Sequence, residues 1–255
     1  YKVKGSLIIL FAVGILLLFL KFRLKKAICL ILVFTAGLGV IGFAYNTAVD
    51  AINPITKQQY EKYEYPVTHW LMMGLKGLGN YYEHDDYYTR SFPSKKEKQD
   101  ANIKVIKERI KDYKFSGLYE HLTEKAVWTW QDGTYYISYH NRKPKNDNIL
   151  MDFLHIDGKY NKAFQNYSSA LQLFILLMIC ISALKTLIKP KVDEMLLIKG
   201  VVFAAFLFFL LWETRSRYLF DMTPLFILLM VDGMDTAKAF LDSFGKPKQQ
   251  TEKQA

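Results

Sequence analysis

The chain has 255 residues, of which 51% are hydrophobic and 23% charged, and its net charge at pH 7 is +10. The average composition is that of a soluble protein, but the apolar residues are gathered in blocks, so the average does not exclude a membrane protein. Positive and negative charges nearly balance within residues 47–168. This balance excludes a nucleic-acid-binding domain there, because such a domain needs a basic face.

Five apolar blocks reach or approach the length of a membrane-spanning helix once their flanking residues are included. A helix needs roughly 20 mostly apolar residues to cross a bilayer. In chain order the blocks are Leu7–Leu20, Ala27–Ala44, Ala170–Leu184, Leu196–Trp212 and Leu219–Val231. The last and shortest block is also open to interpretation as a buried helix of a soluble core. We expect an all-α polytopic membrane protein in which these five blocks are the transmembrane helices.

Lysines and arginines beside these blocks predict the orientation of the protein. The loop Lys21–Lys26 and the segment Lys185–Lys191 are basic and are expected on the cytoplasmic side. Lys2 and Lys4 would then lie outside, against this assignment. The expected organisation is two transmembrane helices with a cytoplasmic basic loop in residues 1–46, an extracytoplasmic domain in 47–168, three transmembrane helices in 169–235 and a cytoplasmic tail in 236–255. Because the chain begins with Tyr1 and runs directly into a span, we expect it to be the C-terminal part of a longer polytopic protein.

The polar segment, residues 47–168, is predicted to form a mixed, mostly α-helical domain rich in aromatic residues. Tyrosines gather in stretches such as NYYEHDDYY and WTWQDGTYYISY. Aromatic side chains with a polar edge serve either as a belt at the membrane interface or as stacking surfaces for sugars. Both interpretations remain open from the sequence.

One short apolar pattern within this domain predicts a helix at the membrane surface. Pro66–Gly79 is too short to span a bilayer and ends in glycines. Proline favours the first turn of a helix, and an apolar helix of this length is suited to the interface. His69 and Trp70 would lie at its start.

Two further local patterns predict a helix and a hairpin. Ser94 and Glu97 match a capping box, so an amphipathic helix is expected to begin there and to end at Gly117. Asp132 and Gly133 lie between aromatic and β-branched residues, which predicts a tight β-hairpin.

Few side chains in the polar segment suggest chemistry. His69 could act on a substrate at the membrane plane, although a histidine bonded to backbone is the alternative. Glu83–Asp86, with the sequence EHDD, offers oxygen and imidazole ligands to a divalent cation, with a solvated acidic turn as the alternative. We therefore predict no certain cofactor or metal site and leave a divalent cation open. Cys29 and Cys180 fall inside spans and are expected to be packing residues.

The connection WETRSRYLFDMTPLF, residues 212–226, places Glu213, Arg215 and Arg217 between two apolar blocks. Arginine holds phosphate oxygens in a fork geometry, so a cluster turned inward would make an anion site in which Glu213 orients a guanidinium. The alternative is a tight turn kept in water by its charges. We expect Arg217 to be held by the start of the last helix and Arg215 to be freer.

The same stretch resembles a known family. WETRSRYLFDMTPLFILLMVDGM is similar to the last two helices of bacterial GT-C-type glycosyltransferases, the protein mannosyltransferase-like and aminoarabinose transferase-like enzymes, in which an acid and Arg-Tyr precede a helix with proline. Glu213, Arg217, Tyr218 and Pro224 occupy those positions here. PVTHWLMMGLKGLGNYYEHDDYYT looks like the outer loop of Gram-positive relatives, and the resemblance covers most of the chain.

The resemblance implies a transferase that moves a sugar from a polyprenyl-phosphate donor to a glycan or protein acceptor at the outer face of the bacterial plasma membrane. With the charge cluster and the interfacial histidine, it predicts substrate-binding roles for Arg217, Arg215, Glu213, Tyr218 and His69, and the resemblance implies a catalytic carboxylate in an outer loop that this chain lacks. Membrane lipid is expected as a partner and nucleic acid is not. Two rival classes remain: a non-catalytic component of polysaccharide assembly or export, and a polymerase or ligase of lipid-linked oligosaccharides.

Overall fold

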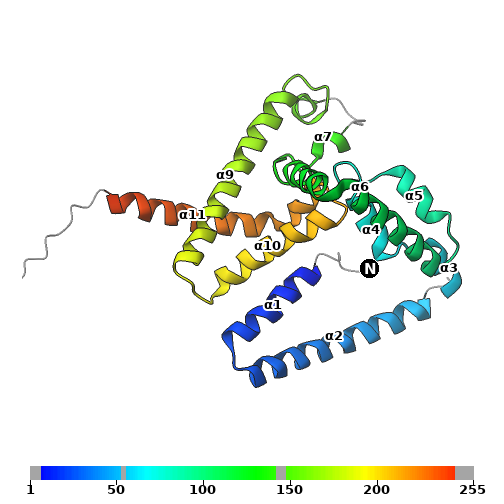
Figure 1. Ribbon diagram of the computed structural model, residues 1–255. Helices are drawn as coiled ribbons and strands as arrows, with labels where there is room; N and C mark the ends of the chain where they lie inside the picture. The colour runs from blue at the N-terminus through cyan, green and yellow to red at the C-terminus, as the bar shows by residue number, and fades with distance from the viewer. Residues whose placement is uncertain (1–6, 53–55, 142–147, 245–255) are drawn as a thin grey trace, which may run out of the picture. The chain divides into compact units, whose positions relative to one another are not determined.

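The computed structural model describes residues 7–52, 56–141 and 148–244, and all regular structure within these ranges is helical (Figure 1). The prediction of an all-α protein is confirmed. The chain divides into two compact units, which are described separately. Unit 1 comprises residues 1–130 and 203–216, and unit 2 comprises residues 131–202 and 217–255.

Three helices are long and apolar enough to cross a membrane: α2 (Leu24–Ile52), α9 (Asn161–Ile188) and α10 (Glu194–Leu211). The predicted first span is a shorter apolar helix, α1 (Leu7–Lys21), which packs along α2. The predicted last span is α11 (Thr223–Phe244), which is long enough but carries several charges in its second half. Three of the five expected spans therefore correspond to helices with the length and composition needed to cross a membrane. The other two spans stay predictions.

The start of the last helix differs from the prediction. Residues Ser216–Met222 form a 3-10 helix, η1, and the α-helix begins only at Thr223. Pro224 fits in the first turn of α11, where its missing N–H needs no helical acceptor. Leu219, the first residue of the predicted span, has no exposed surface and therefore contacts protein instead of lipid.

Unit 1 contains the helices of the polar segment: α3 (Lys57–Tyr63), α4 (Val67–Gly74), α5 (Glu83–Arg90) and α6 (Lys95–Trp130). The capping box predicted at the start of α6 is confirmed, because the Ser94 hydroxyl accepts from the Glu97 amide at 3.2 Å while the Glu97 carboxylate accepts from the Ser94 amide at 3.2 Å. A second capping box, formed by Thr56 and Gln59, begins α3.

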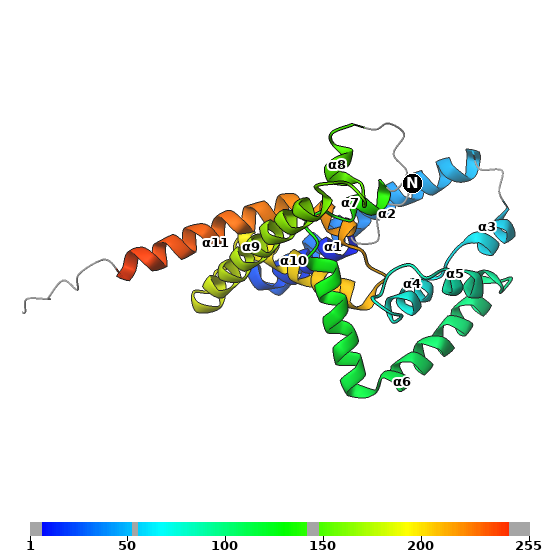
Figure 2. The same ribbon diagram turned by 90° about the horizontal axis from the view of Figure 1, so that it is seen from above.

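The long helix α6 is bent, and its course corrects the predicted end at Gly117. Lys114 has φ 53° and ψ −169°, outside the helical region, and a second helical segment continues from there to Trp130. Figure 2 shows the bend between the two segments. The second segment is long enough to bring His121 and Lys125 against the end of α4. The break therefore lies three residues before the glycine that the pattern indicated.

The short apolar helix α4 is largely buried by protein, and its place at the membrane surface stays a prediction. Met72 and Met73 have no exposed surface, and α4 packs against α5 and α6. The two methionines are covered by protein, whereas Val67 at the start of the helix is 62% exposed. Gly74 lets the end of α4 approach the end of α10, since a Cβ there would lie 2.3 Å from the Leu211 carbonyl oxygen.

The predicted β-hairpin at Asp132 and Gly133 is wrong. The segment is a turn in which the Asp132 carboxylate accepts from the backbone amides of Thr134, at 2.9 Å, and Tyr136, at 3.0 Å. A short helix, α7 (Ile137–His140), follows directly. Side-chain capping of nearby amides competes with strand pairing, and aspartate favours this local alternative.

Unit 2 is built on the packing of α9 against α11, which are connected in the chain through α10. Its buried apolar residues include Met178 on α9 and Phe226 and Leu229 on α11. Gly233 of α11 lies directly on the backbone of α9, because a Cβ at this position would come 2.0 Å from the Met178 carbonyl oxygen. The short helix α8 (Met151–Leu154) packs on the start of α9.

Candidate functional site

The first half of the charged connection after α10 is buried in unit 1. Glu213, Thr214 and Ser216 are almost fully covered. The amide of Glu213 donates to the carbonyl of Trp70 at 3.0 Å, and the amide of Thr214 donates to the carbonyl of Gly79 at 2.8 Å. The alternative interpretation of this half as a turn kept in water is therefore wrong.

Three cationic or imidazole side chains bind the carbonyl end of α4. Arg109 donates to the carbonyl of Met72 at 2.6 Å, and Lys125 donates to that of Gly74 at 2.7 Å. His121 Nε2 lies 3.1 Å from the Gly74 carbonyl. The last carbonyls of a helix lack intrahelical donors and carry partial negative charge, so basic side chains stabilise them.

Lys125 also connects this helix end to α10, since its ammonium group donates to the Leu210 carbonyl at 2.9 Å. The side chain has no exposed surface. Burial lowers the pKa of Lys125 to about 7, and the nearby Glu213 carboxylate opposes this effect only in part.

Glu213 and Arg215 form an ion pair in unit 1, with 3.6 Å between the carboxylate and Nε. The pairing agrees with the expected proximity of the two side chains, and the role of Glu213 in orienting a guanidinium for an anion stays a prediction. The Arg215 side chain is only 13% exposed, and its guanidinium lies 5.9 Å from the ring of Tyr81. The expectation that Arg215 is the freer arginine is therefore wrong, because tertiary contacts hold it.

His69 is a buried residue of unit 1. Its Nδ1 lies 2.8 Å from the Thr89 hydroxyl, which donates to Asn102 at 3.0 Å, so the histidine must supply the proton of the first contact. Its ring stacks on Tyr65 at 4.2 Å. Burial lowers the pKa of His69 to about 4, which keeps the ring neutral at pH 7. A ring enclosed in this way presents no face to a substrate, and we leave His69 out of the site.

The acidic stretch Glu83–Asp86 begins α5, and its last two carboxylates are buried. Asp85 accepts two bonds of 2.7 Å from Arg109. Asp86 pairs with Arg90 at 3.1 Å and accepts from the Tyr65 hydroxyl. The interpretation as a solvated acidic turn is wrong for both aspartates. No group of three metal-ligating side chains occurs in the described ranges, and these carboxylates already face cationic partners.

Unit 2 brings Arg217 together with aromatic residues that lie far away in the sequence. Nη1 of Arg217 lies 3.3 Å from Nε2 of His140, and its guanidinium lies 5.3 Å from the centre of the Tyr218 ring. Tyr136 and Tyr139 stack at 4.5 Å, and His140 contacts both rings edge-on. We call these five residues the arginine–aromatic cluster.

The chemistry of the cluster follows from its donors. Arginine can only donate, so Nε2 of His140 accepts and the imidazole proton lies on Nδ1. Tyr139 and His140 are exposed, and Arg217 is half-buried. The arrangement therefore offers a guanidinium for an anion beside a stacked pair of phenol rings for an apolar sugar face.

The turn before α7 fixes the tyrosines of this cluster. Tyr135 and Tyr136 have φ values of 51° and 67°, a left-handed conformation that non-glycine residues rarely adopt. The Tyr135 hydroxyl lies 3.4 Å from Gln172 of α9 and 3.4 Å from Thr223 of α11. Strained backbone of this kind persists where surrounding contacts require it, and it is frequent at binding sites.

The sequence singled out two members of the cluster, Arg217 and Tyr218, but missed His140, Tyr136 and Tyr139 as site residues. The signal was present in the aromatic run TYYISYH, residues 134–140. Composition alone could not show which arginine lies beside the rings of Tyr136, Tyr139 and His140 in the folded protein.

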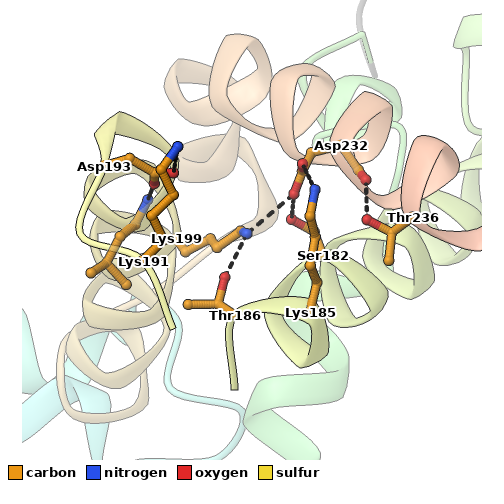
Figure 3. A network of polar contacts seen from close by, with 9 residues as sticks. Ser182, Lys185, Thr186, Lys191, Asp193, Lys199, Asp232 and Thr236 are labelled. Carbon is orange, nitrogen blue, oxygen red and sulfur yellow. Dashed lines mark hydrogen bonds and ion pairs between the residues drawn. The ribbon is translucent and has the colours of Figure 1, made fainter. Parts of the chain in front are cut away.

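A second polar cluster of unit 2 lies among α9, α10 and α11 (Figure 3). Asp232 of α11 accepts from Ser182 at 2.5 Å and from Lys185 at 2.8 Å, both on α9. Lys199 of α10 lies 3.1 Å from the same carboxylate and donates to Thr186 at 2.8 Å. These contacts fasten three helices to one another, and we assign the cluster to packing.

Comparison with known proteins places the chain among membrane proteins. A protein-family model described as "Conserved hypothetical integral membrane protein" matches residues 1–238. No curated protein and no solved structure matches the chain. The match extends over most of the sequence and agrees with the three helices that are long and apolar enough to cross a bilayer. The chain therefore belongs to this family of conserved integral membrane proteins.

Proposed function

We propose that this protein is a GT-C-type membrane glycosyltransferase that binds a polyprenyl-phosphate-linked sugar at the arginine–aromatic cluster. The observation that carries the proposal is the contact of Arg217 with His140 beside the stacked Tyr136 and Tyr139. The sequence resemblance around Arg217 and Tyr218 supports the same class of enzyme.

The position of Arg217 suits a ligand that is half lipid and half sugar. Arg217 lies on η1, directly before α11, and the Tyr135 turn is bonded to both α9 and α11. A polyprenyl chain would lie along apolar helix surface while its phosphate reaches the helix end. Phosphate oxygens fit the fork of a guanidinium, and the sugar ring would rest on the exposed tyrosine.

The reaction explains why a fixed cation is needed. The acceptor oxygen bonds to the anomeric carbon of the sugar and gives its proton to a carboxylate acting as general base. The bond from that carbon to the phosphate oxygen breaks, and its electron pair remains on the phosphate. Arg217 would stabilise this growing negative charge, and a donor that is already in place costs no reorganisation during the reaction. Glu213 and Arg215 would support the connection from unit 1 and would not touch the donor.

We also propose which class of acceptor receives the sugar and on which side of the membrane the reaction takes place. The acceptor is a glycan or protein, and the reaction takes place at the outer face of the bacterial plasma membrane. The basic segment Lys21–Lys26, which covers the end of α1 and the start of α2, supports this orientation, because basic segments beside membrane helices remain in the cytoplasm.

The test is the transfer rate from a purified polyprenyl-phosphate sugar in the full-length protein. Arg217→Ala is expected to reduce turnover at least ~100-fold, as expected for loss of one preorganised charge contact. Arg217→Lys should recover only part of the rate, because an ammonium keeps the charge but not the fork. Lys159→Ala is the matched control, since it removes another cation lying over a tyrosine ring in unit 2.

Membrane abundance is measured for each variant. Near-normal transfer by Arg217→Ala at equal abundance would reject the phosphate site. A wild-type protein that binds the donor without transferring sugar would instead favour a component of glycan assembly or export.

A further inference from the structure

Unit 1 has a pocket that belongs to neither the arginine–aromatic cluster nor the membrane helices. Its volume is about 330 Å³, and its walls are Lys62, Tyr63, Tyr65 and Arg90. The walls come from the end of α3, the linker after it and the end of α5. Two cations and two phenols therefore surround one small space, near the lower end of the range of ligand pockets.

The α3 wall of the pocket is held from behind by a buried lysine. Lys98 of α6 is almost completely covered, and its ammonium group donates to the carbonyls of Glu61, Lys62 and Glu64 at 3.1, 2.5 and 3.2 Å. These bonds fix the backbone that carries Lys62 and Tyr63. A preorganised wall loses little conformational freedom when a ligand binds.

The opposite wall is held by Tyr65. Its ring stacks on the buried His69, and its hydroxyl donates to Asp86 while it accepts from Nε of Arg90. Burial, with the hydrogen bond to Asp86, raises the pKa of Tyr65 to about 12, so the phenol stays protonated and keeps this bond. Both polar contacts of Arg90 within the described part of the chain use Nε, which leaves its two Nη groups for a ligand.

The charges beside the pocket favour an anion. Asp86 is paired with Arg90 at 3.1 Å, and Glu64 is paired with Lys95 at 3.0 Å, so neither pair has a net charge and the net charge of the pocket is set by Lys62. Lys62 adds a further positive charge. Its ammonium group lies over the ring of Tyr63, which is 75% exposed and available for stacking.

We propose that this pocket binds a phosphorylated sugar. The Nη groups of Arg90 and the ammonium group of Lys62 bind the phosphate monoester, and the exposed ring of Tyr63 packs against the sugar. The guanidinium supplies a pair of N–H donors to the phosphate oxygens, and Lys62 supplies the net positive charge. The site does not depend on the proposed transferase activity, and it binds its ligand whether or not the arginine–aromatic cluster holds a donor lipid.

The experiment measures binding of glucose 1-phosphate to the full-length protein in nanodiscs of neutral lipid, with glucose and inorganic phosphate as separate probes. The wild-type protein is expected to bind glucose 1-phosphate more tightly than either fragment. Lys62→Gln should weaken this binding at least ~10-fold, because one of two charge contacts is lost. Tyr63→Ala should weaken binding of glucose 1-phosphate but leave that of inorganic phosphate unchanged.

Both substitutions change exposed side chains, so folding is preserved. Lys104→Gln, an exposed lysine on α6, is the matched control and should bind like the wild type. Equal affinity for glucose 1-phosphate in the wild type and in Lys62→Gln would overturn the proposal. Displacement of the sugar phosphate by phosphatidic acid added to the nanodiscs would assign the pocket to a lipid headgroup and would also overturn it. Neither readout involves sugar transfer, so failure here is distinct from failure of the transferase proposal.

Discussion

Lys125 shows how a single residue can make the stability of unit 1 depend on pH. Its ammonium group is fully buried and reaches two carbonyls, one at the end of α4 and one near the end of α10. Burial lowers the pKa of this group from 10.5 to about 7. Between these two values the unfolded chain binds the proton more strongly than the folded protein, so the free energy of unfolding rises as pH increases from 7 toward 10.5.

Substitution of Lys125 by methionine removes this titration. The free energy of unfolding of the wild type is expected to rise between about pH 7 and about pH 10. For Lys125→Met we expect this rise to be smaller by on the order of 1–3 kcal/mol. Thermal unfolding of the purified protein in detergent at the two pH values measures the difference. Lys104→Met, an exposed lysine of the same helix, should follow the wild type. Equal pH dependence of Lys125→Met and wild type would show that Lys125 is not buried as a neutral group at high pH.

At the scale of elements, the contact between α9 and α11 depends on one glycine and one carboxylate. Gly233 lets the two backbones approach, and the neighbouring Asp232 bonds to Ser182 and Lys185 of α9. The sequence VDGM thus places a small residue next to a carboxylate that forms hydrogen bonds to the neighbouring helix at the same crossing. Small residues at such crossings allow close packing of membrane helices, and polar side chains add hydrogen bonds between them.

Gly233→Ala tests this crossing. The added Cβ would meet the Met178 carbonyl oxygen at 2.0 Å, so the helices must separate, and we expect a loss of roughly 1–3 kcal/mol in stability. Gly42→Ala on α2 is the matched control, because nothing lies within 4 Å of its Cβ. Both substitutions gain the same helix propensity, so the difference between the two variants isolates the close approach. Thermal unfolding in detergent gives both values, and similar stabilities would mean that the crossing is looser than described.

For the whole molecule, the distribution of apolar surface indicates which helices face lipid. α2 exposes large apolar residues along its length, among them Val33, Val40 and Phe43. A helix that is apolar on all sides and uncovered by protein is suited to hydrocarbon. The basic loop Lys21–Lys26 precedes and opens α2, and the polar helices of unit 1 follow it. The two ends of α2 should therefore lie on opposite sides of the membrane.

Cysteine labelling tests this orientation. In a background without Cys29 and Cys180, a cysteine at Lys107 of α6 is expected to react with an impermeant thiol reagent in intact cells, and one at Lys25 is not. Both positions are exposed in the structure, so access differs only by the side of the membrane. Labelling at Lys25 alone would reverse the orientation and move the proposed sites to the cytoplasmic face. The segments 1–6 and 245–255, with the predicted outer lysines and the last part of the predicted cytoplasmic tail, lie outside the described residues, whereas residues 236–244 of that tail belong to α11.

The sequence by itself determined the all-α membrane fold and the start of α6. Hydropathy over about 20 residues predicts a span without knowledge of its neighbours, and the Ser94–Glu97 capping box closes within a single turn. These features depend on residues close together in the chain. The hairpin at Asp132 failed even as a local prediction, because the aspartate side chain binds the amides of the turn.

Only the tertiary structure decided which polar residues are exposed and which residues accompany Arg217. His69 is enclosed by Thr89 and Tyr65. Arg215 contacts Glu213 and Tyr81 in unit 1. Arg217 contacts His140 in unit 2. The segment between His140 and Arg217 in the sequence includes the whole of α9 and α10, and no local sequence pattern encodes a contact over such a separation. Burial and long-range pairing are properties of the packed chain, because they depend on where distant segments come to lie against each other.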